Sequence, residues 1–501
     1  MWLTQILDRN RRWRAGRTAL VDERRAVTWS ELAERVHTLA GGLLAQGLGP
    51  GDRVLLPAPE RIEVFEAYFA LARIGAVAVP VDSLGPAQET AAVARRTGAV
   101  AVLTDLANHT WAADLGLPVA LDLAGSHSDL SDLPPYQGPW PQVRPDDPVA
   151  VMHTSATTGR ARAVVWDHRS LMQVCLAWLA AAGPVEEATF VNCAPLFHGS
   201  VAMSFTYMAG GARIVLPPAS APHRTLEAVT RHRATHLWLD PETLRHLLHA
   251  ARTRPHDTGS LREIVYGGAP LPWEVYRDAA RTFGCAFRQA YGAAEAGGHF
   301  AMLAPHEHPD PRTPPDRHPA LGAGRPLPGV DVRIRRPDGT EADPGENGEI
   351  CVRSDSLMRG YWADPRATAE ATRGGWLHTG DLGRADAAGY LTLVGRQTDV
   401  ITTGGRDVHP AEIERVLLSH AGVADTAVVG RPDPAHGEVP IAYVVPAPAA
   451  RPSPDELTRL IAAELAGHHR PALITFLDTL PRNRSGKILK TILRDMADGR
   501  P

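Results

Sequence analysis

Two lysines occur in this chain of 501 residues, and both lie in one C-terminal stretch, Lys487 and Lys490. Lysine and arginine together number 52, so arginine supplies every other basic side chain. A lysine ammonium is a compact point charge on a flexible stem, whereas a guanidinium is a broad planar fork. A lysine kept in so arginine-rich a chain indicates a task that arginine cannot perform; the alternative is two chance residues near a solvated end.

A hydroxyl-rich loop is the second candidate for chemistry. Residues 152–162 read Met-His-Thr-Ser-Ala-Thr-Thr-Gly-Arg-Ala-Arg and lie between two short apolar runs. The hydroxyl and backbone N–H donors of such a loop can wrap triphosphate oxygens. The loop lacks the Gly-Lys-Ser/Thr ending of a Walker A motif, so an ordinary Ser/Thr turn stays the alternative.

Three further positions add a carboxylate or a cation. Glu295 follows a tight glycine turn, where a carboxylate can hold Mg2+. Asp381 ends the segment Trp-Leu-His-Thr-Gly-Asp and is placed to accept hydrogen bonds from ribose hydroxyls. Arg396 lies at an inferred domain joint. Each also has a plain structural explanation, as a surface carboxylate or a salt-bridge partner.

The elements that must position these residues follow an α/β pattern. From residue 17 to about residue 215, short β-branched runs alternate with longer amphipathic stretches, as in βαβ units on a parallel sheet. A second unit of this kind covers residues 211–266. Thr28 is predicted to open a helix with a capping box, and Gly75 to end the next helix.

The remaining third of the chain predicts two smaller parts. Short alternating segments at 330–334, 348–353 and 390–394 indicate a small β subdomain. We therefore predict an α/β protein whose large N-terminal domain, residues 1–395, has two doubly wound sheets and this β subdomain. Residues 396–501 are predicted to form a small mobile α+β domain that carries Lys487.

Composition bounds the class of protein. An apolar fraction of 44% and a net charge of −4 are those of an ordinary globular protein, and basic runs are too few for a nucleic-acid partner. No stretch approaches the roughly 20 apolar residues that cross a bilayer, and the start lacks a signal-peptide core. Four dispersed cysteines fit a reducing cytosol and argue against structural zinc. We expect a cytoplasmic monomer or homodimer without a membrane span.

Together the chemical segments resemble the adenylate-forming superfamily of acyl-CoA and aryl-CoA synthetases, luciferases and peptide-synthetase adenylation domains. The resemblance covers nearly the whole chain and also includes residues 69–80, 195–199, 266–271, 360–365 and 404–414. It implies that a carboxylate attacks the α-phosphate of ATP, with release of pyrophosphate, and that a thiol then displaces AMP. ATP, Mg2+ and CoA, or the phosphopantetheine of a separate carrier protein, are the implied cofactors.

The resemblance also implies roles for individual positions. Phosphate contacts fall to Thr154, Ser155, Thr157, Thr158 and Arg162, and magnesium contacts to Glu295 and Thr158. The adenosine site is implied at Gly267, Gly268, Ala269, Tyr291 and Gly292, with Asp381 and Arg396 on the ribose. The catalytic set is Lys487, Glu295, Arg162 and His198, with Lys487 bridging the attacking carboxylate and the phosphoryl oxygens.

The C-terminal domain of this superfamily rotates between the two half-reactions, and Thr398 stands at the implied hinge in place of the usual Asp or Lys. Lys490 is expected to be solvated rather than catalytic. Two alanines depart from the family pattern: Ala156 replaces a loop glycine, and Ala294 replaces a threonine that contacts the α-phosphate. The loss of that hydroxyl indicates slow adenylation or a different electrophile.

The acid is expected to be an aryl or a short to medium acyl acid without a free α-amine, because His198 stands where amino-acid-activating domains place an Asp. The implied pocket contains His198, Ser200, Tyr266, Gly267, Gln289, Gly292, Ala293 and Gly297. Asp240 either reads a substituent of the acid or, as the favoured alternative, caps the helix after it. Three alternatives stay open: transfer to an amine, activation of an inorganic acid such as nitrite, and an inactive nucleotide-binding module.

Overall fold

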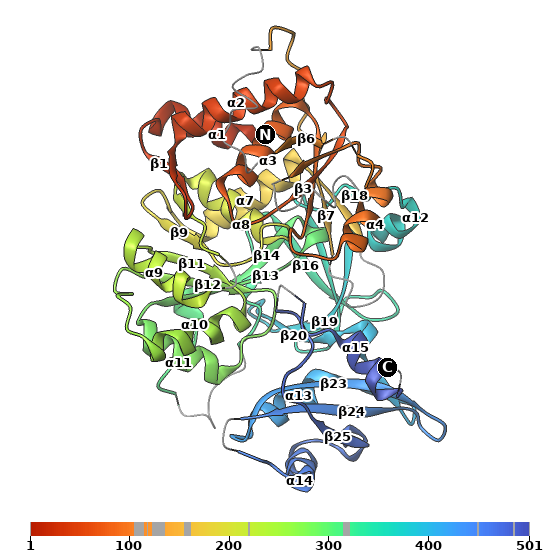
Figure 1. Ribbon diagram of the computed structural model, residues 1–501. Coiled ribbons are helices and arrows are strands. Elements are labelled where there is room, and N and C mark those ends of the chain that lie inside the picture. Colours follow the sequence, from red (N-terminus) through yellow and green to blue (C-terminus); the bar gives the residue numbers. More distant parts are fainter. Residues whose placement is uncertain are drawn as a thin grey trace.

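The computed structural model describes residues 2–104, 115–117, 119–122, 136–154, 162–218, 221–313, 321–447, 450–483 and 486–499. The chain forms a large lobe and, after Arg396, a smaller C-terminal lobe, drawn in blue beneath it in Figure 1. The predicted α/β class, with two large sheets, a small β sheet and a compact C-terminal lobe, is confirmed.

Within the described residues the largest sheet has nine strands, in the order β15-β14-β13-β12-β11-β9-β10-β1-β2. Their bounds are β1 Thr18–Val21, β2 Ala26–Thr28, β9 Thr189–Asn192, β10 Arg213–Val215, β11 His236–Leu239, β12 Glu263–Gly267, β13 Ala286–Ala293, β14 Gly298–Leu303 and β15 Arg325–Pro326. Neighbours from β1 to β13 run parallel, whereas β2, β14 and β15 pair antiparallel with the strands beside them.

The second sheet has the order β18-β8-β7-β4-β3-β5-β6. Its strands are β3 Arg53–Pro57, β4 Val77–Val81, β5 Ala101–Thr104, β6 Val119–Asp122, β7 Pro148–His153, β8 Ala163–Asp167 and β18 Gly360–Tyr361. All five residues of β4 are buried, as expected for a central parallel strand covered on both faces.

Two antiparallel sheets follow. The small sheet of the large lobe has the order β16-β17-β19-β20, with β16 Val330–Arg335, β17 Gly348–Ser354, β19 Leu377–Ala385 and β20 Leu391–Arg396. The C-terminal sheet has the order β22-β21-β24-β23, and β25 adds to β24 in parallel. Its strands are β21 Ile401–Thr403, β22 Arg406–Val408, β23 Val423–Asp433, β24 Gly437–Pro446 and β25 Leu473–Phe476.

The helices of the large lobe are α1 Thr4–Arg14, α2 Trp29–Ala45, α3 Ile62–Ile74, α4 Ala87–Thr97, α7 His168–Ala182, α8 Ser200–Gly210, α9 Pro222–His232, α10 Pro241–Thr253, α11 Trp273–Phe283 and α12 Pro365–Ala371. Those of the C-terminal lobe are α13 Pro410–Leu418, α14 Pro454–Glu464 and α15 Lys490–Ala497. One core, including residues of α1, α2, α3, α7 and α8, joins the two large sheets, and a second lies under α9, α10 and α11.

Local signals fix two helix ends as predicted. The Thr28 side chain accepts a hydrogen bond from the Glu31 N–H, while the Glu31 carboxylate accepts one from the Thr28 N–H, completing the capping box. Gly75 ends α3 with a φ of 72°, the left-handed conformation that glycine adopts without a Cβ penalty.

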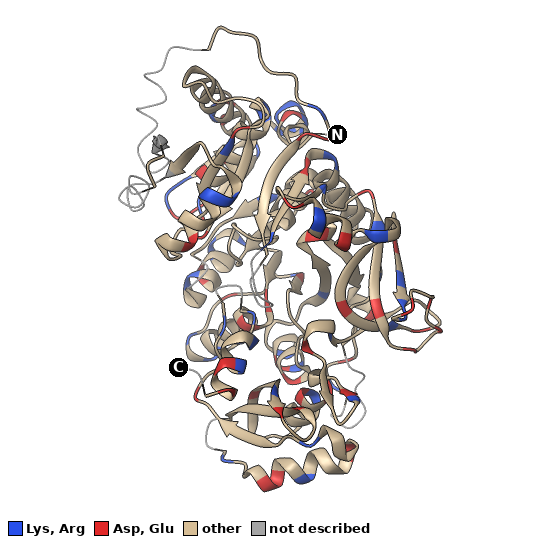
Figure 2. Ribbon diagram, turned by 90° about the vertical axis from the view of Figure 1, so that its right-hand side faces the viewer, with Lys and Arg blue, Asp and Glu red and all other residues tan. Residues whose placement is uncertain are grey.

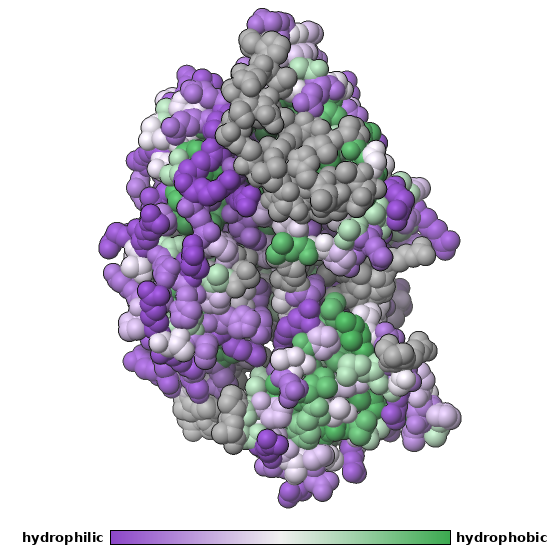
Figure 3. Space-filling view, viewed as in Figure 1, coloured by the Kyte–Doolittle hydropathy of each residue, from purple (hydrophilic) through white to green (hydrophobic). Residues whose placement is uncertain are grey.

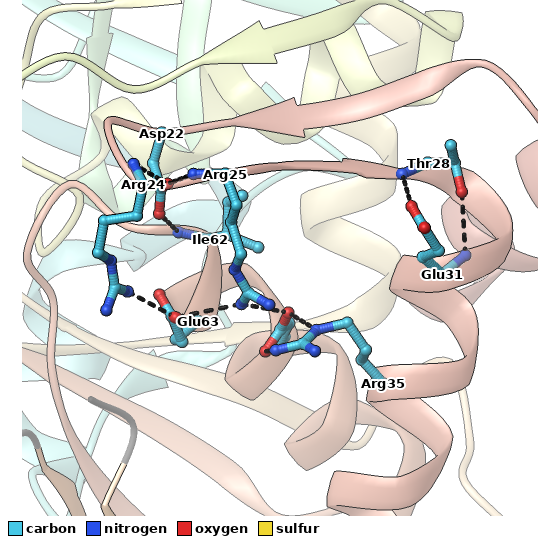
Figure 4. Close-up of polar contacts among 9 residues, drawn as sticks. Asp22, Arg24, Arg25, Thr28, Glu31, Arg35, Ile62 and Glu63 are labelled. Carbon is cyan, nitrogen blue, oxygen red and sulfur yellow. Dashed lines mark hydrogen bonds and ion pairs between the residues drawn. The ribbon is translucent and has the colours of Figure 1, made fainter. Parts of the chain in front are cut away.

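A buried ion-pair network ties the β1–β2 turn to α2 and α3 (Figure 4). Glu66 is 1% exposed and accepts hydrogen bonds from Arg35 at 2.5 Å and Arg25 at 3.1 Å. Arg25 also donates to Glu63, which accepts from Arg24 at 2.6 Å. Burial raises the pKa of Glu66, and the two arginines oppose that shift. This network holds the fold together and does not line the cavity described below.

The surface carries charges of both signs, interspersed along the ribbon in Figure 2, as a net charge of −4 leads one to expect. Apolar side chains are visible on the C-terminal lobe in Figure 3, and the exposed apolar residues of that lobe include Leu473, Phe476, Ile492 and Met496. Among the described residues, no helix combines the length and apolarity that a membrane span requires.

Candidate active site

A cavity of about 1000 Å³ lies at the carboxyl ends of the parallel strands β11, β12 and β13. This is the edge at which open α/β sheets bind ligands. Other parts of its walls come from β7, β8, α8, β14, α12 and β19, and from a loop of the C-terminal lobe. Thirteen of the predicted site residues line it: Thr154, Arg162, His198, Ser200, Asp240, Gly267, Gly268, Gly292, Ala293, Glu295, Arg396, Thr398 and Lys487.

The remaining predicted site residues fall into two groups. Ser155, Thr157 and Thr158, like Ala156, lie outside the described residues. Six predicted residues are described but do not line the cavity: Ala269, Tyr266, Gln289, Tyr291, Gly297 and Asp381.

Tyr266 and Gln289 lie behind the cavity wall for a clear reason. The Tyr266 hydroxyl donates to Gln289 Oε1 at 3.2 Å and lies 3.1 Å from His308 Nε2. This pairing satisfies both side chains inside the protein, so they support the wall instead of forming it. Direct contact between either side chain and a ligand stays a prediction.

Lys487 reaches the cavity from the C-terminal lobe. Burial lowers the pKa of its ammonium to about 8, with Arg396 acting in the same direction. The carboxylates of Asp381, Asp399 and Glu295 oppose that shift. The Lys487 ammonium therefore lies near carboxylates of the large lobe and of the turn that links the lobes.

The loop that carries Lys487 rests on the start of α10. A Cβ on Gly486 would lie 2.7 Å from Asp240 Oδ1, so backbone and carboxylate are in close approach. Arg482, in the same loop, pairs with Asp425 at 2.6 Å inside its own lobe and lies 3.9 Å from Glu242 in the large lobe. The Lys487 N–H donates to Asn483 Oδ1 at 2.9 Å. These contacts hold the loop closed over the cavity.

Lys490 differs from the expectation of a solvated side chain. Its ammonium donates to Glu414 Oε1 at 2.8 Å, and the side chain is only 17% exposed. Lys490 begins α15, and this places its side chain against α13 of the same lobe. The two lysines therefore have different surroundings, and only Lys487 lines the cavity.

A second charged group connects β13 with the small sheet. The Tyr291 hydroxyl donates to Asp381 Oδ2 at 2.7 Å, and Arg396 Nε pairs with Asp381 Oδ1 at 2.9 Å. Asp381 and Arg396 face each other in the β19–β20 ladder, so pairing register sets their separation. Both carboxylate oxygens of Asp381 are therefore held, and Arg396 reaches the cavity from the same cluster.

The third charged group is a chain of three side chains. Arg162 donates to the Tyr361 hydroxyl at 3.1 Å, and that hydroxyl donates to Glu295 Oε1 at 3.0 Å. Burial, together with the charge of Glu295, raises the pKa of Tyr361 to about 12. The indole N–H of Trp166 fixes the turn that carries Glu295 by donating to the Ala294 carbonyl at 2.8 Å.

These charged groups suit a nucleotide with its metal ion. Arg162, Arg396 and Lys487, which we call the cationic wall, present three cations to the cavity. Glu295 places a carboxylate on the same cavity, and oxygen ligands of this kind are what Mg2+ prefers. The donor set therefore fits both a polyphosphate and a hard divalent cation.

The opposite character appears in a group that we call the aromatic wall, formed by His198, Trp238 and His299. Gly267 lies next to it, and a Cβ there would lie 2.9 Å from Trp238 Cη2 and would meet the Ala290 carbonyl. Only glycine allows this close approach. A flat, mostly apolar ligand is suited to such a wall.

Asp240 lines the cavity and also caps α10. Its Oδ1 accepts from the Glu242 and Thr243 N–H groups at 2.9 and 3.0 Å, and its Oδ2 accepts from the Thr243 hydroxyl at 2.7 Å. The favoured helix-cap interpretation is thus what the structure shows, and a role in reading the ligand stays a prediction.

Another group of potential metal ligands lies at the cavity, which two of its members, Glu349 and His378, line. Donor atoms of Glu349, Cys351 and His378 fall within 4.8 Å of one another. Glu349 already pairs with Arg373 at 3.2 Å and with His378 Nδ1 at 2.7 Å. A carboxylate neutralised in this way favours an ion-pair cluster over a metal centre.

Several cavity residues were not identified from the sequence. Tyr361 belonged to a segment used for the resemblance, but no local pattern shows that it joins Arg162 to Glu295 across 199 and 66 positions. Trp238 and His299 look like ordinary strand residues. Two strands, β12 and β13, lie between them in the sheet, and this placement is set by the strand order, which the sequence pattern alone does not give.

Comparison with known proteins defines the class. The family model described as AMP-binding enzyme matches residues 7–362, and the model of the AMP-binding enzyme C-terminal domain matches residues 412–487. The chain belongs to this family, the adenylate-forming enzymes.

Individual relatives cover almost the whole chain. A feruloyl-CoA synthase of Amycolatopsis sp is 37% identical, with 94% of each chain covered. The fatty acid–[acyl-carrier-protein] ligase ScoC of Streptomyces coeruleorubidus is 34% identical over 95% of this chain and 93% of its own. The amide bond synthetase McbA of Marinactinospora thermotolerans superimposes with a TM-score of 0.87, at 30% identity and with 99% of each chain covered.

The chain is accordingly an AMP-forming acid–thiol ligase. It uses ATP, with Mg2+, to convert a carboxylic acid into an acyl adenylate, and it passes the acyl group to a thiol.

Proposed function

We propose that this enzyme activates a planar aryl acid, or arylalkenoic acid, that has no free α-amine, and transfers it to CoA. The observation that carries the proposal is the cavity itself, which joins the cationic wall to the aromatic wall. The first matches a polyphosphate with an attacking carboxylate, and the second matches a flat, apolar acyl group.

The first half-reaction sets the task of the cationic wall. The acid's carboxylate oxygen forms a bond to the α-phosphorus of ATP, and the bond to pyrophosphate breaks. Two like charges about 4 Å apart repel by roughly 4 kcal/mol at an effective dielectric near 20. Lys487 and Arg162 offset that repulsion, with Lys487 between the carboxylate and the phosphoryl oxygens.

Residues of the large lobe hold the nucleotide. We assign Thr154, whose hydroxyl accepts from the Arg162 N–H at 3.0 Å, to the phosphate loop. Glu295 would hold Mg2+, which neutralises developing phosphate charge when bound. Asp381 would accept from the ribose hydroxyls, with Arg396 and Tyr291 fixing its orientation.

The acceptor is proposed from chemistry and from relatives together. In the second half-reaction a thiolate attacks the acyl carbonyl, AMP leaves, and the thiol proton passes to solvent. The feruloyl-CoA synthase supports CoA, and the acyl-carrier-protein ligase supports a protein-bound thiol. Transfer to an amine is the second candidate, because the amide bond synthetase aligns with this chain over 99% of its length at 30% sequence identity.

The pose with Lys487 inside the cavity is the one that adenylation requires. Thr398 and Asp399 lie in the short 3-10 turn that links the lobes, and Arg494 of α15 pairs with Asp399 at 2.5 Å. We propose Thr398 as the pivot about which residues 396–501 rotate for thiol transfer. Residues 1–395 would then be the fixed domain of a cytoplasmic enzyme.

Pyrophosphate exchange tests the proposal. Benzoic, cinnamic and hexanoic acids, alanine and nitrite would be compared in ATP–pyrophosphate exchange, and products with CoA or with amines identified by mass spectrometry. Exchange led by the aryl acids, followed by a CoA thioester, is expected. Exchange that yields an amide but no thioester would establish the second candidate, and ATP binding without exchange for any of them would contradict activation.

A further inference from the structure

His299, on β14, is the one ionisable side chain of the aromatic wall that is boxed between two indoles. Its ring centroid lies 5.6 Å from that of Trp178 on α7 and 5.1 Å from that of Trp238 on β11. Its backbone pairs with that of Gly292, so the strand pairing fixes the position of the His299 Cα atom. Two indole rings, from α7 and β11, therefore flank the imidazole.

One ring nitrogen of His299 lacks a partner among the described residues. Nε2 is sealed from solvent and has no hydrogen-bond partner within the described part of the chain. Since the half-buried side chain lines the cavity while Nε2 is sealed, Nδ1 is the nitrogen left to meet a ligand.

The imidazole is neutral. Burial lowers the pKa of His299 to about 4, and burial is the sole cause of this shift. The ring therefore stands apart from the cations and carboxylates of the cationic wall. The indole N–H groups of Trp178 and Trp238 are likewise sealed without partners among the described residues.

This environment selects the chemistry of what it can bind. A neutral imidazole in an apolar box neither neutralises a second carboxylate nor balances an ammonium group. Asp240, an acidic residue that lines the same cavity, is already engaged at both oxygens as the α10 cap. An uncharged hydroxyl or carbonyl oxygen remains as the group that His299 can pair with.

We propose that His299 is a specificity-determining residue that hydrogen-bonds an uncharged oxygen substituent on the ring of an aryl acid. The proposal rests on the proposed function, since it presumes that the acyl group lies against the aromatic wall. It divides aryl acids into two classes, those with a ring hydroxyl or carbonyl and those without.

A matched set of acids tests it. Cinnamic, 4-methylcinnamic and 4-hydroxycinnamic acids, with the 3-hydroxy isomer, would be compared by kcat/KM in pyrophosphate exchange. Sites built to hydrogen-bond a substrate hydroxyl reject the analogue that lacks it, and here a preference of about 10- to 100-fold for a hydroxylated acid is expected. The methyl compound controls for size.

His299→Leu is expected to abolish this preference, measured within the variant as the ratio of kcat/KM for the hydroxylated acid to kcat/KM for 4-methylcinnamic acid. His299→Asn, which keeps a hydrogen-bonding side chain, should restore part of it. Trp178→Phe is the matched control within the box, because it removes an indole N–H that does not line the cavity. A preference that survives in His299→Leu, or is missing from the unaltered enzyme, overturns the proposal.

A measurement on the unaltered enzyme guards against a variant that fails to fold. The His299 ring signals in an NMR spectrum of the 15N-histidine-labelled enzyme are assigned by their loss in His299→Asn. They should shift when an acyl-adenylate analogue, 4-hydroxycinnamoyl sulfamoyl adenosine, is added, and should not shift with the cinnamoyl analogue. Equal shifts with both overturn the proposal. If every aryl acid fails in exchange and hexanoic acid succeeds, the proposed function has failed, and not this assignment alone.

Discussion

The cationic and aromatic walls of one cavity are built on opposite plans. In the cationic wall the charges are tied to one another: Tyr291 and Arg396 hold Asp381, and Tyr361 joins Arg162 to Glu295. In the aromatic wall, Trp238 and His299 keep ring nitrogens without partners among the described residues. The protein itself orients the charges that act on every substrate, whereas the group proposed to recognise one particular substrate, Nδ1 of His299, is left to pair with that substrate.

The largest expected effect comes from the cationic wall. Lys487→Ala should lower the rate of adenylation by about 10² to 10³, the cost of removing one preorganised electrostatic donor. Thioester formation from a supplied acyl adenylate should change little, because that step does not use the lysine in this pose. Lys490→Ala, paired within its own lobe, is the control. An unchanged rate of pyrophosphate exchange in Lys487→Ala would show that the cationic wall does not act in adenylation through Lys487.

A smaller loss is expected at the ribose position. Asp381→Asn should lower kcat/KM for ATP by about 10- to 100-fold, since it removes a charge-assisted acceptor, and should leave the order of preference among acids unchanged. Steady-state kinetics with ATP varied would check this. Asp331→Asn, in an exposed ion pair of the same sheet, is the control. A changed acid preference would show that the two walls are not independent.

The pH dependence follows from Lys487. Its ammonium is charged below its pKa of about 8 and neutral above it, so kcat/KM for adenylation should be level below pH 8 and fall above it. One proton lost predicts a fall of about tenfold for each pH unit. In Lys487→Arg, whatever its level of activity, kcat/KM should not fall above pH 8, because arginine stays protonated. Identical profiles for lysine and arginine would assign the transition to another group.

The smallest effect is expected where the two lobes meet. Glu242→Gln should slow adenylation by about two- to fivefold, since its interaction with Arg482 is long and partly exposed. The thiol step, which needs the loop to leave, should be unchanged or slightly faster. Measured half-reactions would separate these. Glu227→Gln on α9, in an exposed pair with Arg254, is the control and should alter neither step.

Local rules predicted the fold well where apolar periodicity is strong. The capping box at Thr28, the end of α3 at Gly75 and the strands at 330–334 and 348–353 are confirmed. The long strand β19, Leu377–Ala385, was not predicted, because its His-Thr-Gly-Asp segment shows no alternation of apolar residues. Pairing with β17 and β20 supplies the order that local propensity does not.

Prediction of the site was uneven for a related reason. Residues in short motifs, such as Glu295 and Lys487, could be named because their neighbours in sequence identify them. Tyr266 and Gln289 were expected in the cavity but pair behind its wall, and His299 was not named at all. Which face of a strand turns toward a cavity depends on strand order and register, and a single sequence does not contain either.

The scarcity of lysine turns the enzyme into its own reporter of motion. Any reagent that modifies amines meets two lysine side chains on this chain, and one of them, Lys490, is engaged with Glu414. Lys487 is half-buried at the cavity in this pose, and rotation of the tail lobe away from the cavity would expose it further. The extent of labelling at residue 487 would therefore count the fraction of molecules in each orientation, without any introduced probe.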